Sequence, residues 1–166
     1  MPEDILEQDW RRIILYGQNV ASYKFALGKA LLQLDLNGGS FVEMSDLAVP
    51  FFTEVSRHLK LADKQATSRS SRFLDACRQF NQGQLSSEKL RGKTVQLGFA
   101  NVIDAFHIVD RQEVFNRFFI DQRKEKGGIL LTDEFYKLRD SNQHGNLIEE
   151  TESRWRLVET AWNLGI

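Results

Sequence analysis

Hydrophobic positions recur every three or four residues along most of the chain, the spacing that places side chains on one face of an α-helix. The clearest case is "NVASYKFALGKALLQLDLNGG", residues 19–39. This pattern predicts a helix with Asn19 as its N-cap and with Gly38 or Gly39 as its C-terminal break. A face this broad is typical of a helix at the centre of a core. Its members are Val20, Tyr23, Phe25, Ala26, Leu27, Ala30, Leu31 and Leu34.

Several other segments show helical spacing. "WRRIILYG" predicts a short first helix that Gly17 ends, and "ATSRSSRFLDACRQFNQG" predicts another helix in the middle of the chain. Proline favours the first turn of a helix, so we expect a helix to begin afresh near Pro50 and to run to about Leu61. A last helix is predicted from about Ile148 to Asn163. Its apolar stripe would contain Trp155, Val158, Glu159 and Trp162.

One region departs from the helical pattern. In "VFNRFFIDQRKEKGGILL" two apolar triplets, residues 118–120 and 129–131, flank a polar link that contains two glycines. This arrangement predicts a short β-hairpin with the turn "RKEKGG". Because two strands alone are only marginally stable, the hairpin should lean on helices or add to a sheet. The predicted fold class is therefore mainly α, a compact multi-helix domain with one short β-hairpin near residues 117–131. Residues 1–166 should form this single helical domain.

Composition narrows the class of protein further. Hydrophobic residues make up 42 % and charged residues 27 %, close to the average for soluble globular domains. No apolar run approaches the roughly 20 residues that span a bilayer, so we expect no membrane partner. The acidic start "MPEDILEQDW" differs from a secretory signal, and the single cysteine, Cys77, suits a reducing compartment. We therefore expect a cytoplasmic location, with Cys77 packed on the apolar side of its helix.

Charge is unevenly distributed along the chain. The net charge is only −1, but residues 57–93 contain nine Lys and Arg against three Asp and Glu, with acidic segments on both sides. Ser, Thr, Gln and Asn lie between these cations, and together these side chains are the ones that bind phosphates. An ordinary solvated surface would have the same composition. The candidate DNA-binding residues are Arg57, Lys60, Lys64, Arg69, Arg72, Arg78, Lys89, Arg91 and Lys93.

Residues for catalysis are harder to find. His58, His107 and His144 lie far apart, and none of them belongs to a metal-binding or phosphate-binding motif. The loop "DSNQHGN" offers several polar side chains around His144, but such loops commonly precede a helix. We therefore predict no catalytic residue, no metal site and no cofactor in this chain.

Both ends of the chain resemble a known family. "RIILYGQNVASYKFALGKALL", "TDEFYKL" and above all "NLIEETESRWRLVETAWNLGI" resemble the N-terminal region of a family of bacterial HNH endonucleases. The resemblance covers the two ends well and the middle loosely, and its motifs are structural. It implies that the segment matching Glu152–Ile166 leads onward to a downstream HNH module, which holds the catalytic residues and a divalent metal ion. That module is not in this sequence.

Three hypotheses for function follow. The first is a non-catalytic N-terminal domain of an HNH-type endonuclease that binds or positions DNA through its basic helices. The second is a protein-interaction or dimerisation module of the same parent protein, which would form a homodimer, with the helix around Trp155 and Trp162 as the contact. The third is an enzyme that uses the loop "DSNQHGN", residues 140–146.

Overall fold

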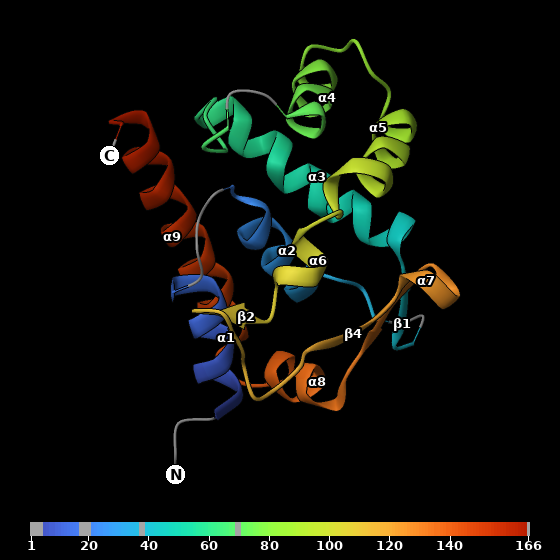
Figure 1. Cartoon of the computed structure of the whole chain (residues 1–166), viewed down its shortest axis with the longest axis vertical. Coiled ribbons are helices and arrows are strands. Elements are labelled where there is room, and N and C mark those ends of the chain that lie inside the picture. Colours follow the sequence, from blue (N-terminus) through green and yellow to red (C-terminus); the bar gives the residue numbers. More distant parts are fainter. Residues whose placement is uncertain (1–4, 17–20, 37–38, 69–70, 166) are drawn as a thin grey trace.

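The computed structural model describes residues 5–16, 21–36, 39–68 and 71–165. These residues form a mainly helical domain, which confirms the predicted fold class (Figure 1). The helices are α1 (Ile5–Tyr16), α2 (Tyr23–Leu32), α3 (Met44–Leu61), α4 (Arg72–Asn81), α5 (Ser87–Lys93), the π-turn η1 (Thr94–Gly98), α6 (Val102–Ala105), α7 (Arg123–Lys126), α8 (Asp133–Arg139) and α9 (His144–Asn163). The strands are β1 (Phe41–Glu43), β2 (Ile108–Val109), β3 (Gln112–Glu113), β4 (Phe119–Gln122) and β5 (Gly128–Leu131).

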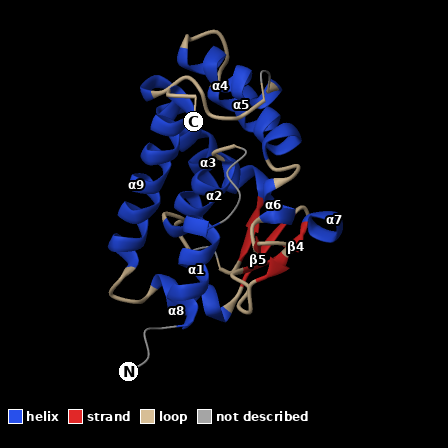
Figure 2. Cartoon of the chain, turned by 60° about the vertical axis from the view of Figure 1, so that its left-hand side comes forward, coloured by secondary structure: helices blue, strands red, loops and turns tan. Residues whose placement is uncertain are grey.

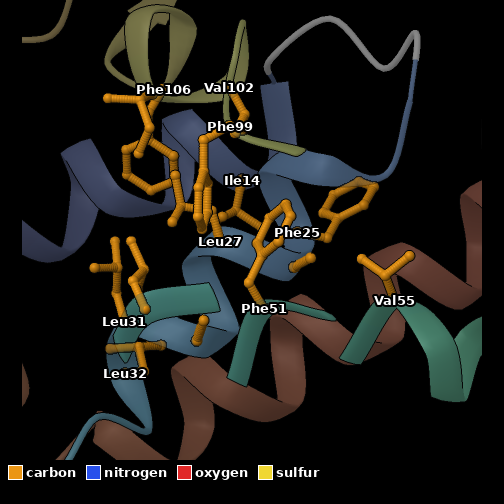
Figure 3. Close-up of a cluster of buried hydrophobic side chains, with 14 of the residues drawn as sticks. Ile14, Phe25, Leu27, Leu31, Leu32, Phe51, Val55, Phe99, Val102 and Phe106 are labelled. Carbon is orange, nitrogen blue, oxygen red and sulfur yellow. The ribbon is translucent and has the colours of Figure 1, made fainter. Parts of the chain in front are cut away.

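Helix α2 lies at the centre of the domain, with α1, α3 and α9 packed around it (Figures 1 and 2). Every residue from Phe25 to Leu32 is buried, which explains why the apolar face predicted for this helix is so broad. Figure 3 shows Phe25 of α2, Phe51 of α3 and Phe99 meeting in this core. The rings of Phe51 and Phe99 have centroids 4.8 Å apart, a spacing at which aromatic pairs attract each other.

The boundaries of α2 differ from the prediction. The helix ends at Leu32 with Gln33 as its C-cap, so Leu34 is buried as part of the following segment and Gly39 does not end the helix. The predicted cap Asn19, the stop Gly17 and the glycine at 38 lie outside the described residues.

The predicted β-hairpin is confirmed. Strands β4 and β5 pair antiparallel, with Phe119 opposite Leu131, and the one-turn helix α7 forms most of the link. Gly127 ends α7 with φ +74°, a conformation that glycine adopts without steric cost. Strand β1 adds to β5 as a third strand. A Cβ at Gly128 would lie 2.2 Å from the Val42 carbonyl oxygen, so this pairing requires glycine.

The helix expected to begin near Pro50 begins earlier, and that prediction was wrong. Helix α3 starts at Met44 and continues through Pro50. Leu47, one turn before the proline, and Phe51, directly after it, are fully buried, so packing of this helix against the core outweighs the local cost of the proline.

The last helix is part of the core. Trp155 is fully buried and Trp162 is 7 % exposed, so both rings pack inside the domain. The long helix α9 runs along α1 and α2 (Figure 2). Among the described residues, no helix combines the length and the hydrophobicity needed to cross a bilayer.

His107 is a buried core histidine, as the absence of a motif around it suggests. Its Nε2 accepts a hydrogen bond from the Phe118 N–H at 2.9 Å, while its Nδ1 is buried without a partner. Burial, together with smaller effects of the nearby charges of Arg117 and Lys24, lowers the pKa of His107 to about 3. The folded state therefore requires the neutral ring.

We predict that His107 makes the domain sensitive to acid. Its pKa is near 6.5 in the unfolded chain and about 3 in the folded one, so below pH 6.5 protons favour the unfolded state. At pH 4.5 this should cost about 2 to 3 kcal/mol. His107→Gln keeps an acceptor for the Phe118 N–H but does not titrate. Urea unfolding at pH 7 and pH 4.5 should show a smaller loss of stability for the variant than for wild type, and equal losses would contradict the assignment.

Candidate nucleic-acid interface and a buried ionic network

Most of the predicted DNA-binding residues lie at one end of the molecule, on the C-terminal half of α3, on α4 and on α5 (the top of Figures 1 and 2). Arg57 and Lys60 are on α3, and Lys64 follows that helix. Helix α4 carries Arg72 and Arg78, and α5 carries Lys89, Arg91 and Lys93. Arg69 lies outside the described residues.

Two of these arginines are held by carboxylates of the same chain. Arg78 lies in an exposed cluster, where its Nε is 2.9 Å from Asp63 Oδ1 and its Nη1 is 2.9 Å from Asp75 Oδ1. Arg57 Nη2 lies 2.9 Å from both Glu54 Oε2 and Glu152 Oε1. Their positive charges are therefore largely compensated within the protein.

The other six cations are exposed and have no salt bridge to any described residue. We call them the basic end: Lys60, Lys64, Arg72, Lys89, Arg91 and Lys93. On α5, Lys89 and Lys93 are four residues apart and share one face, whereas Arg91 points to another face. On that other face of α5, Arg91 lines a groove beside α3. The basic end is therefore a set of cations around one end of the domain.

The structure also contains a buried ionic network that sequence patterns did not predict. Its centre is the Lys29 ammonium on α2, which lies 2.9 Å from Glu54 Oε2 of α3 and 2.8 Å from Glu152 Oε1 of α9. The Lys29 side chain is only 5 % exposed. One buried cation thus joins three helices that are far apart in the sequence.

His58 extends this network along α3 and α9. Its Nδ1 lies 2.6 Å from Glu159 Oε2, and its Nε2 lies 2.8 Å from Glu152 Oε1. Both are hydrogen-bond contacts between a ring nitrogen and a carboxylate oxygen. The ring also stacks on Trp155, with centroids 3.4 Å apart.

Gln65 closes a ring of hydrogen bonds around this histidine. Its side-chain amide donates to Glu159 Oε2, and its Oε1 accepts from Trp155 Nε1 at 2.8 Å. Trp155 Nε1 and Glu159 Oε2 of α9 are therefore satisfied by residues from α3 and the loop after it, as buried polar groups require, whereas Glu159 Oε1 has no hydrogen bond to a described residue.

The network also changes the chemistry of Glu152. Burial acts to raise the pKa of this carboxyl, but hydrogen bonds from Lys29, His58 and Arg57 more than offset it and lower the pKa to about 2. Glu152 is therefore ionised at neutral pH.

The network includes a set of side chains that could hold a metal ion. Ligand atoms of Glu54, His58 and Glu152 lie within 4.8 Å of one another, and such donors bind divalent metals. However, the Lys29 ammonium and the Arg57 guanidinium both contact the two carboxylates. These cations already supply the positive charge that a metal would bring, so the geometry suits a salt-bridge network.

Other candidates from the sequence have structural roles. His144 Nε2 is bonded to the Leu32 carbonyl at 2.7 Å, which ties the start of α9 to the end of α2. Cys77 is buried, and burial raises the pKa of its thiol to about 12, so it is not a nucleophile at neutral pH. Both Trp155 and Trp162 are buried in this chain, so their rings are not available to a partner, and a contact through the exposed side of their helix stays a prediction.

The sequence contains one signal for the network that pattern analysis left aside. Lys29 interrupts the apolar stretch "FALGKALL", and a lysine buried in a central helix requires a carboxylate partner. Its partners Glu54 and Glu152 are 25 and 123 residues away, so spacing along the chain cannot identify them.

Comparison with known proteins found no relative. No family model, no curated protein and no solved structure matches the chain.

We predict that Lys29 is essential for stability. Lys29→Met leaves two carboxylates close together without their buried cation, which should lower the free energy of unfolding by about 3 to 5 kcal/mol. Lys60→Met, an exposed lysine on α3, is the matched control and should cost less than about 0.5 kcal/mol. Urea denaturation measures both.

The double variant Lys29→Met/Glu54→Gln tests the pairing itself. Removing one carboxylate along with the cation should recover part of the loss, so the two substitutions should not be additive. Additive losses, or a Lys29→Met variant as stable as wild type, would contradict the role given to the network.

Proposed function

We propose that this domain binds and positions DNA through its basic end. The observation that carries the proposal is the contrast between its cations. Arg57 and Arg78 are compensated by carboxylates, whereas the six cations of the basic end are exposed and have no salt bridge to a residue in the described part of the chain. When uncompensated surface cations bind DNA phosphates, the counterions that surround the DNA are released, and this release drives binding to nucleic acid.

The charge of the remaining surface supports the same orientation. The segments before residue 57 and after residue 93 both carry more Asp and Glu than Lys and Arg. A polyanion is attracted to the basic end and repelled by the acidic remainder, so the field of the protein would steer DNA to α4 and α5.

The resemblance of the two chain ends supplies the context of the proposal. We propose that the domain is the N-terminal part of a cytoplasmic HNH-type endonuclease of bacteria, in which another module cuts DNA with a divalent metal ion. In this arrangement the described domain contributes affinity and orientation. This part of the proposal rests on the residues quoted for the resemblance.

A protein-interaction role is the second candidate, and one observation favours it. Tyr16 at the end of α1 is 68 % exposed and Leu157 on α9 is 58 % exposed. Leu157 and Leu15 line a groove between these helices. Exposed apolar side chains beside a groove are common where proteins associate. Any such contact would use this face, on a different part of the domain from the basic end.

We predict that duplex DNA binds with a strong dependence on salt and that the basic end carries it. Arg72→Glu/Lys89→Glu/Lys93→Glu should reduce affinity at 50 mM salt by at least about tenfold and should flatten the salt dependence, because each lost phosphate contact removes about 0.9 from the log–log slope. Fluorescence anisotropy with a labelled duplex measures both quantities.

The control is Lys124→Glu/Lys126→Glu on α7, which changes two exposed lysines beside the sheet. This variant should bind almost as wild type does. Equal losses in both variants would indicate that only net charge matters, and wild-type binding by the first variant would refute the assigned surface.

A further inference from the structure

A groove lies between the end of α2, strand β1, helix α3 and helix α5. Its volume is about 600 Å³, within the range of pockets that hold small molecules. Arg91, a member of the basic end, lines it from α5. The groove therefore adjoins the surface to which we assign DNA.

The walls of the groove suit a flat, weakly polar ring. Phe41 and Val42 of β1 line one side, and Val49 and Pro50 of α3 line another. Phe41, Val49 and Pro50 are only half-buried, so apolar surface remains open to a ligand. Nucleobases stack well on such surfaces because every base has an apolar face.

The polar groups of the groove are mainly hydrogen-bond acceptors. Asp46 on α3 is exposed and has no salt bridge to a described residue. Pro50 has no N–H to give to the Asp46 backbone carbonyl four residues earlier, so this carbonyl lacks its usual helical donor. A ligand that donates hydrogen bonds, such as an amino group on a ring, would satisfy these atoms.

The charges of the groove separate a base from its phosphate. Glu54 is compensated by Lys29, whereas Asp46 keeps a negative charge that repels phosphate from the interior. Arg91 is the one cation that lines the groove among the described residues, and it can hold a phosphate outside.

We propose that this groove accepts an unstacked nucleobase bearing an exocyclic amino group, with the Asp46 carboxylate as acceptor for the amine and Arg91 on the adjoining phosphate. This inference rests on the proposed DNA-binding function and deepens it, because it adds recognition of a base to binding of the backbone. Proteins that handle extruded bases read them in the same way, by hydrogen bonds and by packing against the ring.

CMP and UMP form a matched pair of probes, because CMP has an amino group at ring position 4 where UMP has a carbonyl group. In NMR titrations of the ¹⁵N-labelled chain, CMP should shift the backbone amides of Val49 and Thr53 and should bind about tenfold more tightly than UMP. Asp46→Asn should remove this preference, because an amide can also donate to the UMP carbonyl. Thr53→Arg fills the groove from an exposed position and should abolish the CMP shifts.

The other outcomes overturn the inference. If ribose 5-phosphate shifts the same amides as strongly as CMP does, the groove binds anions only. If CMP and UMP bind equally, or if neither shifts these amides, the groove does not read a base. The anisotropy experiment separates this failure from failure of the proposed function, since duplex binding that depends on Lys89 and Lys93 would leave that function in place. If the duplex does not bind either, both proposals fail.

Discussion

The burial of the Lys29 ammonium between carboxylates of α3 and α9 is the constraint on which the arrangement of the helices depends. A buried charge without a partner costs several kcal/mol, so α2, α3 and α9 must pack where Glu54 and Glu152 both reach it. The stacking of the His58 ring of α3 on the Trp155 ring of α9 holds these two helices together at a second position along their length. Apolar contacts supply most of the stabilisation of the core, whereas the network specifies one register of its helices.

This register has consequences at the basic end. Helices α4 and α5 pack on α3, so the position of α3 also sets the positions of Arg72, Lys89 and Lys93. Inside the domain the Lys29 ammonium is matched by carboxylates, whereas the cations of the basic end have no salt bridge to a described residue. Glu54 belongs to both environments, because it bonds Lys29 in the network and also lines the groove beside Arg91.

Local patterns in the sequence were enough to predict the helical class and the hairpin. The periodicity around Phe25 to Leu32 and the glycine pair before Ile129 act within a few residues, so they can be read directly. The course of α3 through Pro50 could not be predicted from local patterns, because packing of the whole helix outweighs the preference of one residue. Cation clustering in residues 57–93 indicated a candidate surface, but its division into compensated and free charges depends on contacts across the fold.

Hydrogen–deuterium exchange of the 166-residue chain, with and without a saturating DNA duplex at low salt, tests the central claim most directly. The account predicts slower exchange on DNA binding at residues 72–81 and 87–93, with little change along α1 and the exposed side of α9. Protection confined to α1 and α9, or no protection under conditions that saturate a control DNA-binding protein, would contradict it.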